Sequence, residues 1–203
     1  MKQPIRHINP FFVHESCPFK AFVLNISYCR DVSHMSFLAH RIKPHLVDAS
    51  KQYPNFETWY SKVSTELLYG LRSIVFIYHK NDIAAFSILK HSDVEKKICT
   101  FYTVNKYRRN HIGNLLMQNS LQLLGSGSVL ITMPDKKVDE FRNILSKYNF
   151  VNQNKIMNYY NKNEEEYFFI RNSVPYSRYI KELPASHLEC KNYSSYSDQH
   201  YNV

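Results

Sequence analysis

Two adjacent arginines, Arg108 and Arg109, precede Gly113 at a point where a strand-like segment gives way to a helical one. The first turn of a helix has N–H groups without intrahelical acceptors and carries a partial positive charge, and together these features bind phosphate groups. A glycine there lets a ligand approach the backbone, and arginines add charge-assisted hydrogen bonds. Residues 107–113 are therefore a candidate site for a pyrophosphate-bearing ligand.

The segments around this site are expected to form a sheet flanked by helices. Hydrophobic periodicity and turn residues predict strands at residues 20–29, 73–79, 83–90, 98–104, 129–133, 150–160 and 167–170. They predict helices at residues 32–49 (interrupted by Pro44), after the cap residue Asn55, at residues 108–124, and after the cap residue Asp135. Short polar turns between the strands from 73 to 104 indicate an antiparallel meander. The acidic run 164–166 is interpreted as a solvated turn.

The composition indicates a basic protein with anionic ligands. Lys and Arg number 26 against 17 Asp and Glu, which gives a formal net charge of +9 and favours a nucleotide cofactor or nucleic acid. The four cysteines, Cys17, Cys29, Cys99 and Cys190, form no CxxC pair, so neither a zinc site nor a disulfide scaffold is expected. Residues 1–6 lack the continuous apolar region of a signal peptide, and no apolar run approaches membrane-spanning length. We therefore expect a cytoplasmic protein with no metal and no membrane partner.

The chain is expected to divide into one α/β domain at residues 1–171 and a tail or arm at residues 172–203. The tail is rich in Ser, Asn, Pro and His without a clear period, which is typical of a segment that needs a partner to become ordered. Its tyrosines predict contact with a second subunit, as in a homodimer, or with another partner. They are Tyr176, Tyr179, Tyr193, Tyr196 and Tyr201.

The order of the expected elements over residues 20–170 resembles that of the GNAT superfamily of N-acetyltransferases. The sharper likeness is in TVNKYRRNHIGNLL, residues 103–116, which is similar to the family's acyl-CoA signature Arg/Gln-x-x-Gly-x-Gly/Ala. Arg108 matches its first position and Gly113 its last. The resemblance implies a mixed, mostly antiparallel sheet of about six or seven strands with about four helices on its two faces.

The resemblance further implies acetyl-CoA, or another acyl-CoA, as the cofactor. Its pyrophosphate would lie on the loop and helix start, and its pantetheine arm would pair with the end of the preceding strand. The residues implied are Thr103, Val104, Arg108, Arg109, Asn110, His111, Ile112, Gly113 and Asn114. His111 stands where the family usually has its first glycine, and its side chain and restricted φ are expected to crowd the phosphate loop.

For catalysis, the resemblance implies a backbone N–H that stabilises the developing oxyanion, expected at Val104, and a tyrosine that protonates the leaving thiolate. Leu145 occupies the usual place of that tyrosine. The candidate donors are instead Tyr148, for which core packing is the favoured interpretation, and Tyr159 and Tyr160, expected on the sixth strand. No carboxylate lies on the strand at residues 98–104 to act as base.

Three further residues, His45, Glu57 and Tyr60, fall where the family walls its acceptor site. A lone His or Glu at such a position is more often a solvated or capping residue, so none of the three is assigned a catalytic role.

Three functions therefore stay open. The first is an N-acyltransferase that acetylates a primary amine on a protein, a small molecule or a nucleic acid such as aminoacyl-tRNA. The second is a non-catalytic module of the same fold that binds nucleic acid or a protein through its basic, tyrosine-rich surface; His111 and Leu145 favour it. The third is a phage-type acyltransferase that modifies a DNA base, for which basicity is the only indication.

Overall fold

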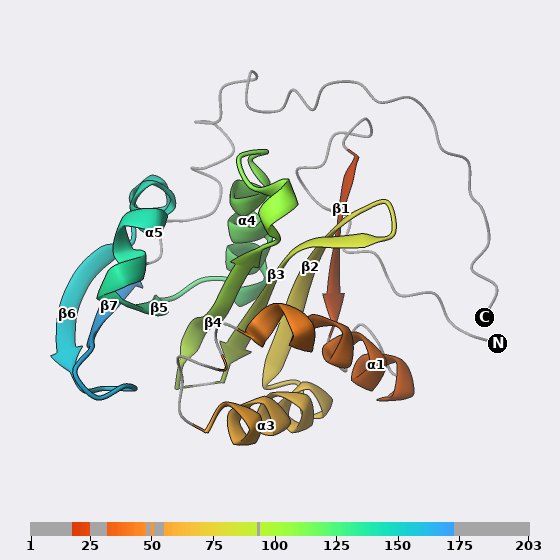
Figure 1. Cartoon of the computed structure of the whole chain (residues 1–203), viewed down its shortest axis with the longest axis horizontal. Helices are drawn as coiled ribbons and strands as arrows, with labels where there is room; N and C mark the ends of the chain where they lie inside the picture. Colours follow the sequence, from red (N-terminus) through yellow and green to blue (C-terminus); the bar gives the residue numbers. More distant parts are fainter. Residues whose placement is uncertain (1–17, 25–31, 48–49, 51–54, 93, 173–203) are drawn as a thin grey trace.

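The first half of the chain is built around a β-meander and the second half around helix–strand units (Figure 1). The computed structural model describes residues 18–24, 32–47, 50, 55–92 and 94–172. Its elements, in order, are β1 (Phe19–Leu24), α1 (Val32–Ile42), the 3-10 turn η1 (Lys43–Leu46), α3 (Phe56–Leu68), β2 (Arg72–His79), β3 (Asp82–His91), β4 (Lys96–Thr103), the 3-10 turn η2 (Asn105–Tyr107), α4 (Ile112–Leu124), β5 (Val129–Pro134), α5 (Asp135–Lys147), β6 (Val151–Met157) and β7 (Glu165–Arg171).

Seven strands form one mixed sheet in the order β1-β2-β3-β4-β5-β7-β6. Strands β1 to β4 are antiparallel neighbours, β4 and β5 are parallel, and β5, β7 and β6 are again antiparallel. Four α-helices lie within the described residues. The predicted mixed, mostly antiparallel α/β architecture is confirmed.

The core lies in two layers, one on each face of the sheet. On one face, apolar residues of α4 and α5 such as Leu116 and Leu145 pack on strand residues such as Ile131. On the other face, α1, η1 and α3 pack on β2 and β3, with Val63 and Phe86 fully buried. Figure 1 shows α4 and α5 in its upper half and α1 and α3 in its lower half. The helices are amphipathic, so each buries one face against the sheet.

Several boundaries differ from the prediction. Helix α4 begins at Ile112 and not at residue 108, because residues 108–111 form a loop with two left-handed residues. The predicted helix over 32–49 ends as an α-helix at Ile42, where Pro44 allows only a 3-10 turn. Strand β6 ends at Met157.

Some predictions cannot be compared with the structure. Cys17, Cys29, Cys190 and the tail from residue 173 onward lie outside the described residues.

Candidate active site

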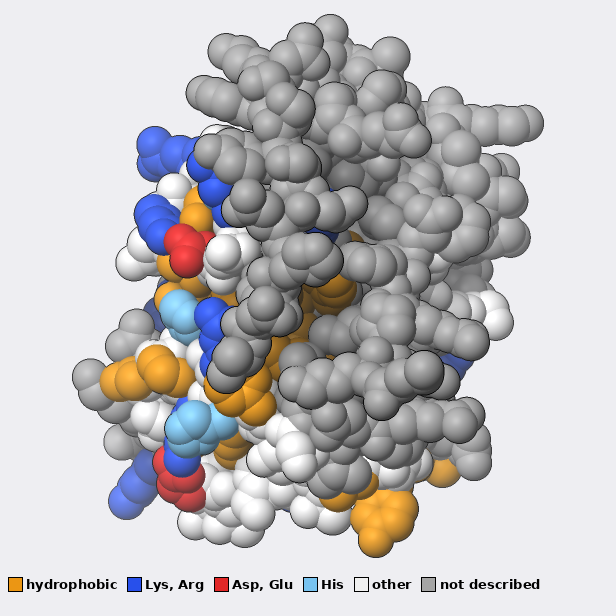
Figure 2. Space-filling view, turned by 90° about the vertical axis from the view of Figure 1, so that its right-hand side faces the viewer, with side chains coloured by type: hydrophobic (Ala, Val, Ile, Leu, Met, Phe, Trp, Pro, Cys, Tyr) orange, Lys and Arg blue, Asp and Glu red, His pale blue; other side chains and the backbone are white. Residues whose placement is uncertain are grey.

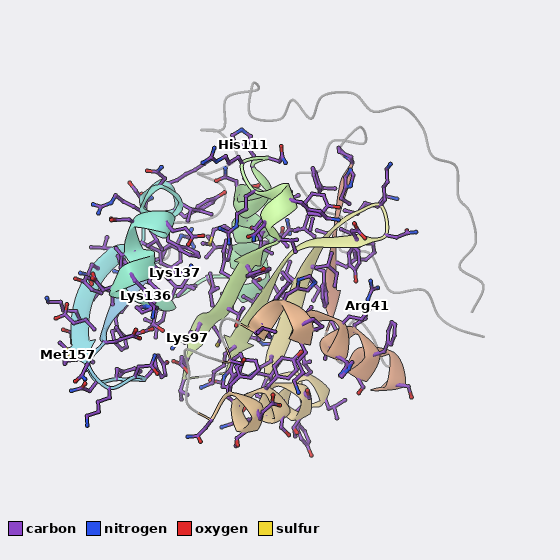
Figure 3. All side chains as sticks on the ribbon, viewed as in Figure 1. Arg41, Lys97, His111, Lys136, Lys137 and Met157 are labelled. Atoms are coloured by element: carbon purple, nitrogen blue, oxygen red, sulfur yellow. The ribbon has the colours of Figure 1, made fainter. Side chains whose placement is uncertain are left out.

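The loop at residues 108–111 connects the end of β4 to the start of α4, and Figure 3 shows His111 at the tip of α4. Arg109 and His111 both adopt left-handed backbone conformations, with φ of 65° and 58°. Within the described part of the chain, no backbone carbonyl accepts a hydrogen bond from the N–H groups of Arg109, Asn110, Ile112 or Gly113. These N–H groups lie together with the positive end of the α4 dipole, the arrangement that binds anions.

The turn η2, which precedes the loop, is anchored to Asp82, the first residue of β3. Asp82 Oδ2 accepts a hydrogen bond from Lys106 Nζ at 2.6 Å and another from the Tyr107 hydroxyl at 3.1 Å. The ring of Tyr107 also packs edge-on against Phe19 and lies beside His79. The hydrogen bonds from Lys106 and then Tyr107 lower the pKa of Asp82. The preceding turn η2 therefore fixes where the loop begins.

Arg108 links the end of β4 to helix α5. Its Nε donates to the backbone carbonyl of Thr103 at 3.3 Å, and its Nη1 lies 3.2 Å from Glu140 Oε1. Glu140 also pairs with Lys137 at 2.9 Å, and Figure 3 shows Lys136 and Lys137 on α5. The predicted phosphate-binding arginine is thus held in place, with one carboxylate beside it.

Gly113 lies where α4, α5 and β4 meet. A Cβ atom at this position would lie 3.5 Å from Ile144 Cδ1 and 4.0 Å from Phe101 Cε1, which is ordinary van der Waals contact. The space therefore accepts a methyl group. This agrees with Gly or Ala at the last position of the signature.

The edge of β4 that faces β5 is mostly unpaired, because the two strands pair only at Lys97–Leu130 and Ile98–Ile131. Backbone groups in an antiparallel pair point alternately toward and away from the partner strand. Since the Val104 N–H donates to the Ala84 carbonyl of β3 at 2.9 Å, the backbone groups of Thr103 and Phe101 point toward this open edge. The Arg108 contact with the Thr103 carbonyl is consistent with that direction.

The oxyanion donor predicted at Val104 is therefore wrong. Its N–H already donates to an acceptor inside the meander. The N–H groups of Phe101 and Thr103 are the ones that the open edge presents. The sequence could not locate them, because the direction of each N–H depends on the register with β3.

His111 occupies the left-handed conformation that glycine would favour. Its φ is 58°, it begins α4 without a side-chain capping bond, and its side chain is exposed. Histidine is among the side chains enriched in this conformation, so the loop keeps its shape without the glycine. The remaining signature residue, Asn114, donates its N–H to the His111 carbonyl at 3.0 Å.

Tyr148 is a core residue. It is only 4% exposed, and its hydroxyl donates to the backbone carbonyl of Asn114 at 3.1 Å. Leu145, at the usual place of the tyrosine acid, is equally buried. The surroundings of Tyr148 are therefore those of a packed core residue, which is the interpretation favoured from the sequence.

Tyr159 and Tyr160 lie in the turn after β6, not on the strand as predicted. The two rings are edge-on at 4.5 Å, and Tyr159 also packs edge-on against Phe168 at 4.9 Å. Tyr160 reaches β4, where Lys97 Nζ donates to its hydroxyl at 3.1 Å. Burial lowers the pKa of Lys97, but the interactions with Tyr160 and other neighbours outweigh it, and the net pKa is raised.

Glu166 is the residue that sequence reasoning missed. The sequence predicts a solvated turn for the acidic run, but Glu166 belongs to β7 and is only 4% exposed. Burial raises the pKa of its carboxyl to about 7, against the smaller effects of a hydrogen bond from Thr132 and the charge of Lys97. A carboxylate with a pKa near neutrality suits acid–base chemistry.

The three residues expected near the acceptor site have different surroundings. Glu57 is exposed and pairs with Lys43 at 2.8 Å. The Tyr60 hydroxyl is buried and donates to the Ala39 carbonyl, and burial raises its pKa. His45 is half-buried beside Tyr102 of β4, and burial, with a smaller effect of Arg41, lowers its pKa. The ring of His45 thus lies next to a side chain of the open strand β4.

Many basic side chains in the second half of the chain are paired with acids. Lys106, Arg108, Lys136, Lys137 and Lys155 each lie within 3.2 Å of a carboxylate oxygen. In Figure 2, the described part of the face on the β1 side shows Lys and Arg interspersed with acidic, histidine and apolar side chains. The positive charge of the five paired residues is thus partly compensated by neighbouring carboxylates. The described residues also contain no group of three or more His, Cys, Asp or Glu that could hold a metal ion, and none of their helices is long and apolar enough to cross a membrane.

Comparison with known proteins gives matches in structure. No protein-family model matches the sequence, and no curated protein matches it. The ribosomal-protein-S18-alanine N-acetyltransferase from Escherichia coli gives a TM-score of 0.56 at 15% identity, over 77% of this chain and 96% of that one. A GNAT-family acetyltransferase from Bacillus cereus ATCC 10987 gives 0.54 at 10% identity, over 77% and 98%.

Proposed function

Because the chain has the fold of the GNAT acetyltransferases, we propose that it is an N-acyltransferase. The acyl donor would be acetyl-CoA or another acyl-CoA, and the acceptor would be a primary amine. The fold alone does not decide the activity. The proposal therefore depends on the site at the end of β4.

The observation that carries it is the continuity between an open strand edge and an anion-binding loop. Backbone groups of Phe101 and Thr103 face the unpaired edge of β4, which suits the amide-rich pantetheine arm. The same strand leads into the N–H groups of residues 109–113 and the guanidinium of Arg108, which suit a pyrophosphate. An acyl-CoA matches both features, and when bound it supplies an acyl thioester for transfer to nitrogen.

Isothermal titration with acetyl-CoA tests this site. The wild type is expected to bind with a Kd in the micromolar range, on the order of −8 kcal/mol, and Arg108→Ala combined with Gly113→Asp should abolish binding. The matched control is Lys62→Ala on α3, which removes one positive charge from an exposed position on the other face of the sheet. Absence of heat from a folded wild-type protein would contradict the proposal.

The second candidate is a non-catalytic module of the same fold that binds nucleic acid or a protein partner. It is favoured by Leu145, a buried core residue at the usual place of the tyrosine acid. A gel shift with tRNA or DNA at low salt tests it, since binding to phosphates falls steeply with salt. The pairing of basic residues with acids leads us to expect weak binding. A tight, salt-sensitive complex would reverse the order of the two candidates and would revive the DNA-modifying alternative.

A cytoplasmic location and a homodimeric state remain predictions from the sequence. Gel filtration with light scattering, on the full chain and on a chain ending at Asn172, tests the second. Loss of a dimer on truncation is expected if the tail supplies the contact.

A further inference from the structure

The second half of the sheet has one face that lies outside both layers of the core. Leu130 of β5, Ile170 of β7 and Val151 of β6 are paired across the three strands, and side chains paired in this way lie on the same face. None of them belongs to either hydrophobic cluster of the core. Their neighbours Ile131 and Phe169 point to the other face, where α5 packs. Figure 1 shows α1 and α3 beside β2 and β3, away from β6 and β7. The described helices therefore leave this face of β5, β7 and β6 uncovered.

The uncovered face is apolar and accessible over part of its area. By the strand register, Ile156 and Phe168 lie on the same face as Ile170. Val151 is 58% exposed and Ile156 37%, and Tyr159, which packs edge-on against Phe168, is itself 47% exposed. A contiguous apolar surface of this kind marks a site of interaction. We call it the open face, and it consists of Leu130, Val151, Ile156, Phe168 and Ile170.

The chain leaves the sheet at one end of the open face. Ile170 is followed by Arg171, the last residue of β7. The Ser128 hydroxyl, just before β5, donates to Asn172 Oδ1 at 3.0 Å, which fixes the chain one residue further on. Residues 173–203 of the tail follow and lie outside the described part of the chain. The tail thus begins beside the Ile170 end of the open face.

The first part of the tail has the composition and the length to cover an apolar surface of this size. Residues 174–180 read VPYSRYI, with two aromatic side chains, two aliphatic ones and a single charge. Strands lie about 4.8 Å apart and rise about 3.3 Å per residue, so about three extended residues cross from β5 to β6 and about five follow the open face along β6. The segment 174–180 is therefore long enough to span the open face in either direction.

A segment of the same chain is favoured over a second copy of the protein by its proximity. A short connection to the binding surface gives an effective concentration in the millimolar range. A second copy would have to lose its translational and rotational freedom to occupy the same surface. The tail, which starts next to the open face, pays much less of that cost.

We propose that residues 174–180 pack on the open face of their own chain and cover β5, β7 and β6 there. Tyr176, Tyr179 and Ile180 supply the apolar surface of the tail, since large aromatic side chains bury the most area per residue. Phe168 is the aromatic ring of the sheet that they cover. The partner of the tail in this arrangement is the sheet of the same molecule, and the contact does not depend on the proposed acyltransferase function.

Limited trypsin digestion of the full-length protein tests the contact, with each cleavage followed by mass spectrometry. Arg178 lies inside the segment 174–180, whereas Lys191 lies beyond it in the same tail. Each rate is divided by the rate at the same site in the free peptide 173–203, which corrects for the preference of trypsin. Because proteolysis acts on the open population, corrected cleavage after Arg178 should be at least about tenfold slower than after Lys191. Equal corrected rates at the two sites would overturn the proposal.

Substitutions at exposed positions of the sheet show which surface gives the protection. Val151→Asp combined with Ile156→Asp places two charges on the open face and should remove the protection of Arg178. The matched control is Val94→Asp, which changes an apolar side chain that is 92% exposed on the turn between β3 and β4, and it should leave the protection intact. Protection that survives the double substitution, or that is lost equally in the control, would assign the tail to another surface and overturn the proposal.

Light scattering of the full chain at the concentrations used for digestion separates the tail from a second copy of the protein. A contact within one chain should give the same protection of Arg178 at every protein concentration, including those at which the protein is a monomer. Protection that appears only as a dimer forms would show that a second copy takes part, and it would overturn the assignment of the open face to the tail of the same chain.

Discussion

The hydroxyl of Tyr148 donates a hydrogen bond to the backbone carbonyl of Asn114 at 3.1 Å, across the junction between the end of α5 and the first turn of α4. The bond ties the helix start that carries the proposed phosphate site to the second helix on the same face. We therefore interpret Tyr148 as a residue that holds the start of α4 in position.

Tyr148→Phe should therefore destabilise the fold with little effect on chemistry. Loss of one hydrogen bond is expected to lower the free energy of unfolding by about 1 kcal/mol, measured by urea denaturation. Turnover with acetyl-CoA and butylamine should fall by less than about threefold. A loss of about 10²-fold in kcat would instead make Tyr148 a proton donor.

His111→Gly should stabilise the protein and tighten acetyl-CoA binding. A residue with a side chain in the left-handed region costs about 1 to 2 kcal/mol. Replacement by glycine removes this cost, but the greater conformational freedom of glycine in the unfolded chain offsets part of the gain. We expect a net gain of about 0.5 to 1 kcal/mol in the free energy of unfolding.

Arg109→Gly, at the other left-handed position, should give a similar gain in the free energy of unfolding. It should bind acetyl-CoA more weakly, because the substitution removes a positive charge. Equal affinity of the two variants would argue against a role for Arg109 in phosphate binding.

Glu140→Gln should tighten acetyl-CoA binding by about two- to fivefold at low salt. The substitution removes a negative charge that lies 3.2 Å from Arg108. The guanidinium would then interact with the phosphates of the ligand without a competing carboxylate. Asp139→Asn is the control, because its carboxylate pairs with Arg142 and not with Arg108. Titration in 50 and 300 mM salt should show the gain shrinking as salt rises, and equal effects of the two variants would exclude a specific Arg108 contact.

Glu166 predicts a pH dependence of stability whose sign is opposite to that of a paired carboxylate. Its pKa rises from 4.5 to about 7 on folding, so the folded state binds more protons than the unfolded state between these values, and stability falls as pH rises through that window. Relative to Glu166→Gln, the wild type should lose about 3 kcal/mol of unfolding free energy between pH 4.5 and 7. Urea denaturation of both proteins at pH 5 and 8 measures it, and parallel curves would contradict a raised pKa.

The sequence by itself determined the order of the elements and the position of the loop for which we propose phosphate binding. Apolar spacing along α4, the β-branched runs of the meander and the contiguous stretch from Arg108 to Gly113 are local properties, so they can be interpreted one segment at a time. Helix α4 nevertheless starts at Ile112, because the left-handed residues before it follow no periodicity.

Only the tertiary structure decided which groups face the site. The Val104 N–H is used inside the meander and those of Phe101 and Thr103 are not, since strand register fixes the direction of each. Glu166 belongs to an acidic run that is polar by sequence, yet it is buried in β7, where it pairs with Pro134 of β5. Burial and the pKa depend on residues distant in sequence, and no local pattern contains that information.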